Sequence, residues 1–351
     1  MRSLRIAEIG FDRPALTRVV LLLPHSCHIG NSASHFFCES LPMNYPIDHH
    51  FIPAFFLAQW AGASDKLVEY TIKHGKLIPK PVGPRGTGFE SHLYSFPELP
   101  PDAAQFIEQV FFNYADRVAA DALNNHLTKT PTPWTVDLVS AWSRFVIAVH
   151  LRHPDAMPEL RAAVKSIWDG SGAAYQAEYE AIKKPGDPPT FDEYLAVRDP
   201  LVPSKMHVNM IVKAFDNDVL GKHINNMIWG VIDVSASPHR FLLSDRPVLI
   251  ADLKESIGMV ALPIGPTKLF IATNSDAGTR HLRSLHAREL VHKLNYFVVG
   301  RARKFVWAHD QSQTAFIEKQ MSKRMESTPL FPNIGKYPDP SISGEGAGAG
   351  L

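Results

Sequence analysis

The segment from residue 227 to residue 273 constrains the fold most, because it packs several short apolar runs into a small stretch of chain. Gly, Pro, Ser or Asp residues separate the runs, a pattern typical of β-strands. The predicted strands span 227–234, 240–243, 248–251, 259–263 and 268–273. Because a parallel crossover needs about a dozen residues or more, strands this close together must pair antiparallel.

The chain before these strands has a helical period. Apolar residues recur on one helical face after Asp102, which is expected to cap a helix of about five turns. The residues of this stripe are Ile107, Val110, Phe111, Tyr114, Val118 and Ala122. The stretch 136–151 is apolar around most of its circumference, which predicts a helix that is buried on several sides and ends before Pro154.

Less regular patterns predict further helices on both sides of the strands. These cover 156–182, 204–224, 280–303 and 312–325, with a short buried helix at 53–62. A hairpin is predicted at 67–71 and 76–79 around the turn dipeptide His74-Gly75. The predicted fold class is therefore α+β, a mainly helical body packed on a small antiparallel sheet formed by the second half of the chain.

The domain organisation follows from length and composition. The chain has 351 residues, without an internal repeat or a clean linker, so we expect a single α+β domain at 43–330. Residues 1–42 lack a sustained period and organised sequence starts at Met43, which predicts a disordered arm or an over-long gene start. The Gly-rich composition predicts a disordered tail at 331–351.

The balance of acidic and basic residues excludes a long-range electrostatic field that would attract a charged partner. Lys and Arg number 36 against 35 Asp and Glu, so a partner must be held by a local patch, and we expect no extended nucleic-acid contact. The apolar run at 19–23 is too short to span a membrane, which predicts a cytoplasmic protein without membrane association. Both cysteines, Cys27 and Cys38, precede Met43, so the rest of the chain has no thiol chemistry.

The first candidate site residue is His50, in the run Asp48-His49-His50-Phe51-Ile52-Pro53. Two imidazoles and a carboxylate stand just before a helix start, where free N–H groups favour an anion such as phosphate. His50 could act there as a general base or a metal ligand, or it could simply hydrogen-bond a neighbouring loop. The run also resembles the start of an HNH-type nuclease, but residues 54–62 lack the Asn and His of that unit.

Several charged residues near apolar elements are further candidates. Asp245 and Arg246 lie between two predicted strands, where they could form part of a site or a tight turn. Arg152, at the end of the buried helix, could hold an anionic ligand or neutralise a buried carboxylate. Glu108 lies at the border of its helix's apolar face and could be a ligand, an acid or a solvated charge.

Several common catalytic motifs are missing or incomplete. The sequence contains no Gly-x-Ser-x-Gly and no His-Glu-x-x-His. The loop at 83–88 is rich in glycine but lacks the Gly-Lys-Ser/Thr ending of a P-loop. Glu289-Leu290-Val291-His292 is a single Glu-x-x-His, whereas di-iron bundles need two, so we interpret it as a solvated helix face.

Separated segments carry a family resemblance when they are taken in order. They are His49-His50-Phe51-Ile52-Pro53, Phe145-Val146-Ile147-Ala148 with Arg152-His153-Pro154, Trp229, Phe241-Leu242-Leu243-Ser244-Asp245-Arg246-Pro247-Val248, and Leu294-Asn295 ahead of Ala302. Together they resemble an uncharacterised bacterial family, domain of unknown function 4238, marked by a His-x-x-Pro motif near its N-terminus. The family pattern usually has Asn where this sequence has Arg246. The resemblance implies that His50, Arg152, Asp245 and Asn295 converge on one polar site, and it supports Met43 as the start.

Two functional hypotheses follow from these residues. The first is a metal-assisted hydrolase of a phosphodiester or nucleotide substrate, with a divalent metal ion and the catalytic residues His50, Asp245 and Glu108. Its predicted substrate-binding residues are Arg152, Arg246 and Asn295. The second is a non-catalytic ligand-sensing or protein-interaction protein, whose His/Arg/Asp cluster only locks the helical part to the sheet.

Overall fold

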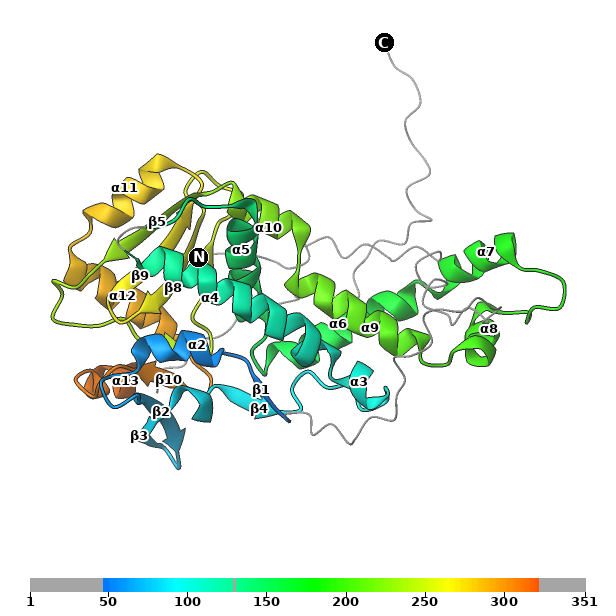
Figure 1. The fold of residues 1–351 in the computed structure, drawn as a ribbon, viewed down its shortest axis with the longest axis horizontal. Coiled ribbons are helices and arrows are strands. Elements are labelled where there is room, and N and C mark those ends of the chain that lie inside the picture. Colours follow the sequence, from blue (N-terminus) through cyan, green and yellow to red (C-terminus); the bar gives the residue numbers. More distant parts are fainter. Residues whose placement is uncertain (1–46, 129–130, 322–351) are drawn as a thin grey trace, which may run out of the picture.

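A computed structural model describes residues 47–128 and 131–321. Within these residues the strands form three antiparallel sheets, and helices make up most of the remaining ordered chain (Figure 1). The fold is α+β, as the sequence predicts. The predicted N-terminal arm at 1–42 and the predicted tail at 331–351 lie outside the described residues.

Four of the five strands predicted at 227–273 form one four-stranded sheet, whereas the predicted strand at 240–243 is absent except for Leu243, which belongs to a different sheet. The order of these four strands is β5 (Ile228–Asp233), β9 (Lys268–Thr273), β8 (Met259–Gly265) and β7 (Leu249–Ala251). Every neighbouring pair is antiparallel, which confirms the argument from strand spacing. Strands β8 and β9 are buried along almost their whole length, because helices cover the sheet.

A second four-stranded sheet joins the two ends of the described chain. Its order is β3 (Lys76–Val82), β2 (Leu67–Lys73), β10 (Val306–Ala308) and β6 (Leu243–Ser244). The β2–β3 hairpin is confirmed, and its turn residues have φ of 50° at His74 and 76° at Gly75. The sheets therefore do not come from the second half of the chain alone, because the N-terminal hairpin pairs with β10.

A two-stranded sheet positions the His-His segment. Strand β1 (Asp48–His50) pairs with β4 (Phe89–Ser91), and His50 lies opposite Phe89. Strand β1 leads through Phe51 and Ile52 into helix α2 (Ala54–Leu57), with Pro53 at its N-cap. The predicted short helix at 53–62 is therefore a single α-helical turn followed by a 3₁₀ turn.

The remaining helices lie in three runs along the chain. The first run is α3 (Pro101–Ala104), a π-helix (Ile107–Phe112), α4 (Asn113–Leu127) and α5 (Val136–Leu151). The second run is α6 (Ala156–Gly170), α7 (Gly172–Ile182), α8 (Phe191–Arg198), α9 (Val202–Phe215) and α10 (Asp218–Asn225). The third run is α11 (Asp276–Ser284), α12 (Ala287–Gly300) and α13 (Thr314–Met321). Helix α5 has the predicted bounds and is buried on several sides.

The π-helix changes which face of the following helix is buried. The stripe predicted from the sequence includes Val110 and Tyr114, yet both are more than half exposed, at 54% and 58%. Ile107 and Ala122 of the stripe are buried as predicted, but between them the buried residues are Phe112, Ala115 and Ala119, which lie outside the stripe. A π-helix adds one residue to a turn, so it shifts the buried face by one position along the sequence. The prediction was wrong for Val110 and Tyr114 for that reason.

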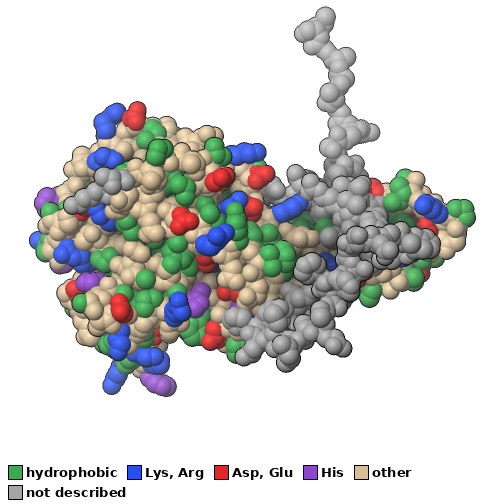
Figure 2. Space-filling view, in the orientation of Figure 1, with side chains coloured by type: hydrophobic (Ala, Val, Ile, Leu, Met, Phe, Trp, Pro, Cys, Tyr) green, Lys and Arg blue, Asp and Glu red, His purple; other side chains and the backbone are tan. Residues whose placement is uncertain are grey.

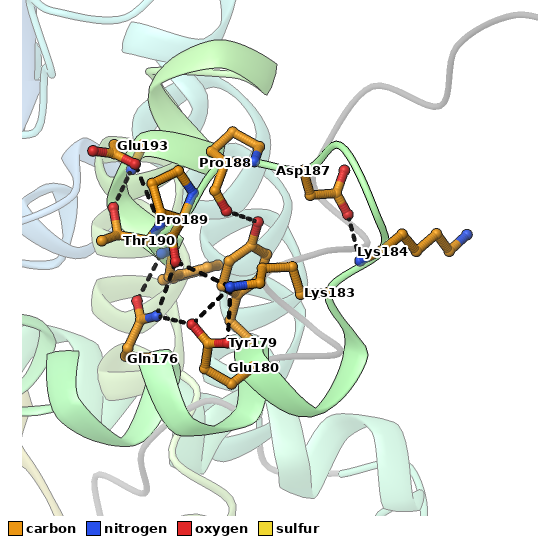
Figure 3. Close-up of polar contacts among 11 residues, drawn as sticks. Gln176, Tyr179, Glu180, Lys183, Lys184, Asp187, Pro188, Pro189, Thr190 and Glu193 are labelled. Atoms are coloured by element: carbon orange, nitrogen blue, oxygen red, sulfur yellow. Dashed lines mark hydrogen bonds and ion pairs between the residues drawn. The ribbon is translucent and has the colours of Figure 1, made fainter.

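Helices α7 and α8 project from the main body. Helices α6 and α9 run together away from the sheets, and α7 and α8 lie at their far end (Figure 1). This arm has its own small core of Tyr175, Tyr179, Phe191, Leu195, Val202 and Met206. Polar contacts close it, as Figure 3 shows: Tyr179 Oη donates to the Pro188 carbonyl at 2.8 Å, and Thr190 and Glu193 form a capping box.

The visible surface carries mixed charge. Figure 2 shows acidic and basic side chains interspersed over this face, in keeping with a formal net charge of +1. Among the described helices, none is both long and apolar enough to cross a membrane.

Gly88 packs closely against the segment that connects β1 to α2. Its φ is 73°, and its carbonyl accepts hydrogen bonds from the backbone N–H groups of Phe51 at 2.9 Å and Ile52 at 3.1 Å. A Cβ atom at this position would lie 2.9 Å from Leu57 Cδ1 and 3.1 Å from the Ile52 carbonyl. Both the backbone conformation and the space therefore require glycine.

We expect Gly88→Ala to lower the free energy of unfolding by about 2–3 kcal/mol, from left-handed backbone strain plus overpacking. Gly75→Ala is the matched control, because Gly75 has φ of 76° but a Cβ atom there would meet no other atom within 4 Å. We expect this control to cost only about 1 kcal/mol. Urea denaturation measures both, and equal losses would show that the contacts of Gly88 contribute nothing.

Candidate functional site

His49 and His50 have different surroundings, because neighbouring residues of a strand point to opposite faces. His49 is fully buried and stacks on Tyr94, with ring centroids 5.6 Å apart. Its Nδ1 accepts a hydrogen bond from the Tyr94 backbone at 3.0 Å, and its Nε2 lies 2.9 Å from Gln105 Oε1. Both ring nitrogens of His49 are therefore used in holding the fold together.

His50 is half-buried and has an unpartnered ring nitrogen. Its ring packs edge-on against Phe89 at 5.4 Å, and its Nε2 is buried without a hydrogen-bond partner. Burial lowers the pKa of His50, and the positive charge of Arg152 lowers it further, while the backbone of Arg85 acts in the opposite direction. The imidazole is therefore neutral at pH 7 and free to exchange a proton at Nε2.

Arg152 is the charged centre of the site. It follows the last residue of α5, and its side chain is fully buried. Its Nε donates to the Phe51 carbonyl at 3.0 Å, and its Nη1 donates to Asp116 Oδ1 at 3.0 Å. The guanidinium lies 4.8 Å from the centre of the Phe112 ring. Its Nη2 is buried and makes no hydrogen bond.

Glu108, on the π-helix, completes the site. Burial raises the pKa of its carboxyl from 4.5 to about 7; Arg152 opposes this shift, Asp116 adds to it, and a hydrogen bond to the His50 backbone lowers it. Glu108 therefore lies beside the His50 strand and within the field of Arg152. Its Oε2 is buried without a hydrogen-bond partner.

Three elements thus bring one unpartnered polar atom each to the same region. These atoms are His50 Nε2 from β1, Glu108 Oε2 from the π-helix and Arg152 Nη2 from the end of α5. Tyr94 closes the region from the core side, since its hydroxyl donates to the Arg152 carbonyl at 2.8 Å. We name His50, Glu108 and Arg152 the His50 site.

Asp245 and Asn295 hold backbone segments. The Asp245 carboxylate accepts hydrogen bonds from the backbone N–H groups of Arg303, Lys304 and Phe305 at 2.9, 2.6 and 3.0 Å. Asn295 accepts from the Leu242 backbone N–H at 2.9 Å and donates to the Arg240 carbonyl at 2.8 Å. These hydrogen bonds connect both side chains to other parts of the fold rather than to the His50 site.

Arg246 lies in a second polar cluster. Its Nη2 donates to Asp155 Oδ2 at 2.9 Å, and Arg303 approaches the same oxygen. The six residues predicted from the sequence therefore divide into the three residues of the His50 site, two residues that hold backbone segments, and Arg246 in the second polar cluster.

Asp116 and Tyr94 were missed by the sequence interpretation. Asp116 is not among the residues of the predicted apolar stripe, yet it pairs with the buried Arg152. The shift caused by the π-helix explains this, because the true buried face passes through Ala115. The tyrosine carried no sequence signal, since its role depends on where its backbone meets His49 and Arg152.

The described residues contain no group of three or more His, Cys, Asp or Glu side chains that could hold a metal ion. Glu108 and His50 are the polar groups of the His50 site with an unpartnered atom that can exchange a proton. The arrangement can therefore bind an anion through Arg152 and exchange protons at His50 and at Glu108.

The comparison with known families agrees with the sequence resemblance. Residues 48–312 match the family described as Protein of unknown function (DUF4238). Because the match covers most of the chain, the protein belongs to this family. No curated protein and no solved structure has a detectable match to it.

The raised pKa of Glu108 gives a testable dependence of stability on pH. The folded protein keeps this proton up to about pH 7, whereas the unfolded chain releases it near pH 4.5. Between these values the folded state binds more protons, so the free energy of unfolding falls as the pH rises. The expected contribution is a slope of about 1 kcal/mol per pH unit.

Urea denaturation at pH 5, 6, 7 and 8 measures this slope. We expect Glu108→Gln to lack the contribution, so that the difference in stability between the variant and the wild type changes between pH 5 and about pH 7 and levels off above that value. Glu90→Gln, at an exposed position on β4, is the control and should leave the wild-type slope unchanged. A parallel pH profile for Glu108→Gln and the wild type would contradict the raised pKa.

Proposed function

We propose that the protein is a hydrolase that acts on a phosphodiester or nucleotide substrate at the His50 site. The observation that carries this proposal is that three side chains from separate elements each have a buried, unpartnered polar atom and that the charge of Arg152 acts on the other two. Buried polar groups in proteins are normally hydrogen-bonded, because leaving one unpaired costs about 1–3 kcal/mol. A substrate phosphate and an attacking water would supply partners for all three atoms.

Each residue has a role that fits its surroundings. Arg152 donates from Nη2 to a phosphate oxygen and balances the negative charge that develops there. Neutral His50 accepts the proton of the attacking water at Nε2. Glu108, with a pKa of about 7, donates its proton to the leaving oxygen.

The protonation states that these roles require give the expected pH dependence of the reaction. Turnover requires Glu108 to be protonated, so the rate falls as the pH rises through about 7. It also requires His50 to be neutral, so the rate falls again below the lowered pKa of that imidazole. We therefore expect a bell-shaped profile with its maximum on the acidic side of neutrality.

The sequence-based form of this hypothesis adds a divalent metal ion held partly by Asp245. In the proposal, the acid–base chemistry belongs to Glu108 and His50, and Asp245 is a positioning residue that fixes the loop at 303–305. Asn295 similarly positions the chain before β6. The cytoplasmic location predicted from the sequence is part of this proposal.

A structural role for the cluster is the second candidate, and one observation favours it. Arg152 is fully buried, with an ion pair to Asp116 and a hydrogen bond to the Phe51 carbonyl, so it also ties α4, α5 and the β1 segment together. In this alternative the protein binds a ligand or partner without turnover.

Hydrolysis assays separate the two candidates. The wild type is tested on bis-p-nitrophenyl phosphate and on short dinucleotides, with and without added Mn²⁺. We expect turnover that falls at least ~100-fold in Glu108→Gln and in His50→Gln. The exposed Glu90→Gln variant is the control and should keep wild-type activity.

Two results would reject the hydrolase. The first is no turnover of either substrate class by folded wild-type protein with or without Mn²⁺. The second is turnover that survives both Glu108→Gln and His50→Gln, which would place the activity elsewhere.

A further inference from the structure

A second polar cluster, separate from the His50 site, lies where the end of α5 meets the loops after β6 and α12. We name it the basic cluster. Its members are Arg246, Arg301, Arg303, His150 and His153. They come from three segments that are far apart in the sequence, so the fold alone assembles them.

One carboxylate oxygen shows how the arginines are arranged. Asp155 Oδ2 lies 2.9 Å from Arg246 Nη2 and 3.7 Å from Arg303 Nε. Two guanidinium groups therefore already converge on one oxygen anion. The Asp155 side chain is 52% exposed, whereas that of Arg246 is only 11% exposed, so the carboxylate can leave while the arginine stays in place.

Arg246 has a buried hydrogen-bond donor without an acceptor, and Arg301 has a charge that no ion pair within the described residues balances. The Nε of Arg246 is buried and has no hydrogen-bond partner. Arg301 donates to the Val248 carbonyl at 2.9 Å but forms no ion pair within residues 47–128 and 131–321. Burial and the neighbouring Arg246 lower the pKa of Arg301 to about 10, which reflects the cost of holding these cations together.

The negative charge beside Arg246 is limited. Asp245 faces this arginine, but its carboxylate is occupied by three backbone N–H groups. Asp155 also lies against Arg246, and it is half exposed. Because Arg246 and Arg301 are neighbouring buried cations, a further anion between them would relieve their mutual repulsion.

His153 adds a hydrogen-bond donor to the basic cluster. Its Nδ1 accepts a hydrogen bond from the Ala156 backbone at 3.1 Å, so the neutral ring carries its proton on Nε2. Burial lowers the pKa values of His150 and His153, and the nearby arginines lower them further. Both rings are therefore neutral, and they can donate to an anion without being protonated first.

We propose that the basic cluster binds the phosphate group of a small molecule, which takes the place of the Asp155 carboxylate between Arg246 and Arg303. Phosphate matches the cluster because it can accept from Arg246 Nε and Nη2 together, as well as from Arg301. This proposal does not depend on the hydrolase, since it uses none of the residues of the His50 site.

Calorimetric titration at low salt with inorganic phosphate and with adenosine monophosphate tests the proposal. We expect binding that weakens at least ~10-fold in Arg246→Gln and in Arg301→Gln. Arg280→Gln, at an exposed position on α11, is the control and should bind like the wild type. Tighter binding of the nucleotide identifies a phosphate monoester as the ligand, and equal binding identifies the phosphate group alone; both support the site.

Asp155→Asn keeps the proposal falsifiable if an arginine variant does not fold. Removal of the competing carboxylate should tighten phosphate binding several-fold, which a folding defect cannot imitate. Unchanged or weaker binding in Asp155→Asn would overturn the proposal, as would the absence of binding of both probes to the wild type. Binding that is lost in His50→Gln would also overturn it, because the phosphate would then occupy the His50 site.

Discussion

Replacement of Arg152 by methionine lowers the free energy of unfolding by about 3–5 kcal/mol, the expected cost of breaking a buried ion pair from one side. The variant keeps much of the side-chain volume but leaves the Asp116 carboxylate without its partner at 3.0 Å. It also leaves the buried Phe51 carbonyl without the hydrogen bond from Nε. Both losses fall where α4, α5 and the β1 segment meet.

Urea denaturation followed by tryptophan fluorescence measures the effect of Arg152→Met. Arg144→Met is the control, because Arg144 pairs with Asp216 at 2.7 Å but both side chains are solvent-accessible, at 26% and 45%. We expect that control to cost at most about 1 kcal/mol. Adding Asp116→Asn to Arg152→Met should recover part of the loss, since it removes the unpaired charge.

A loss below about 1 kcal/mol in Arg152→Met would contradict the buried ion pair. It would also weaken the structural alternative for the His50 site, which assigns Arg152 a role in stability alone. A large loss of stability in Arg152→Met does not test the hydrolase proposal. The hydrolysis assays with Glu108→Gln and His50→Gln test it.

Asp245→Ala should have a similar effect for a different reason. The Asp245 carboxylate accepts three backbone hydrogen bonds from consecutive residues, Arg303, Lys304 and Phe305. Burial raises the pKa of Asp245, and these three bonds oppose the rise, so the carboxylate is held by them rather than by solvent. Without it, three N–H groups lose their acceptor, and we expect a loss of about 3–5 kcal/mol.

The loop at 303–305 provides a local readout for Asp245→Ala. Amide hydrogen exchange of these three residues should become much faster, in addition to the loss of global stability. Asp233→Ala is the control, because Asp233 makes a surface ion pair with Lys268 at 2.6 Å and caps the Ser235 backbone. Unchanged exchange at 303–305 would show that the three bonds do not hold this loop.

Periodicity in the sequence predicted most of the regular elements. Helix α5 and strand β9 have the predicted bounds, because each repeats one strong pattern over its whole length. The predicted helix at 204–224 is instead divided into α9 and α10. Strands β1, β4 and β10 were not predicted, since runs of three residues carry too little pattern to be recognised.

The site was only partly visible in the sequence. His50, Glu108 and Arg152 were selected one by one from their chemistry and their position beside apolar elements. Nothing in the spacing of residues 50, 108 and 152 indicates that they meet, because the π-helix and the end of α5 bring them together. Asp245 and Asn295 have the same kinds of side chain, but the fold uses them to hold backbone segments.

By itself, the sequence determined the α+β class and the antiparallel pairing of strands β5, β7, β8 and β9, because short-range periodicity and short connections leave few alternatives. Only the tertiary structure decided which face of α4 is buried, which strands join the N-terminal hairpin to β10, and which polar residues share a site. Those outcomes depend on contacts between distant residues, such as Arg152 with Phe51 and Asp116, which lie 101 and 36 positions away, and on one extra residue in a helical turn. Local sequence patterns carry no information about either.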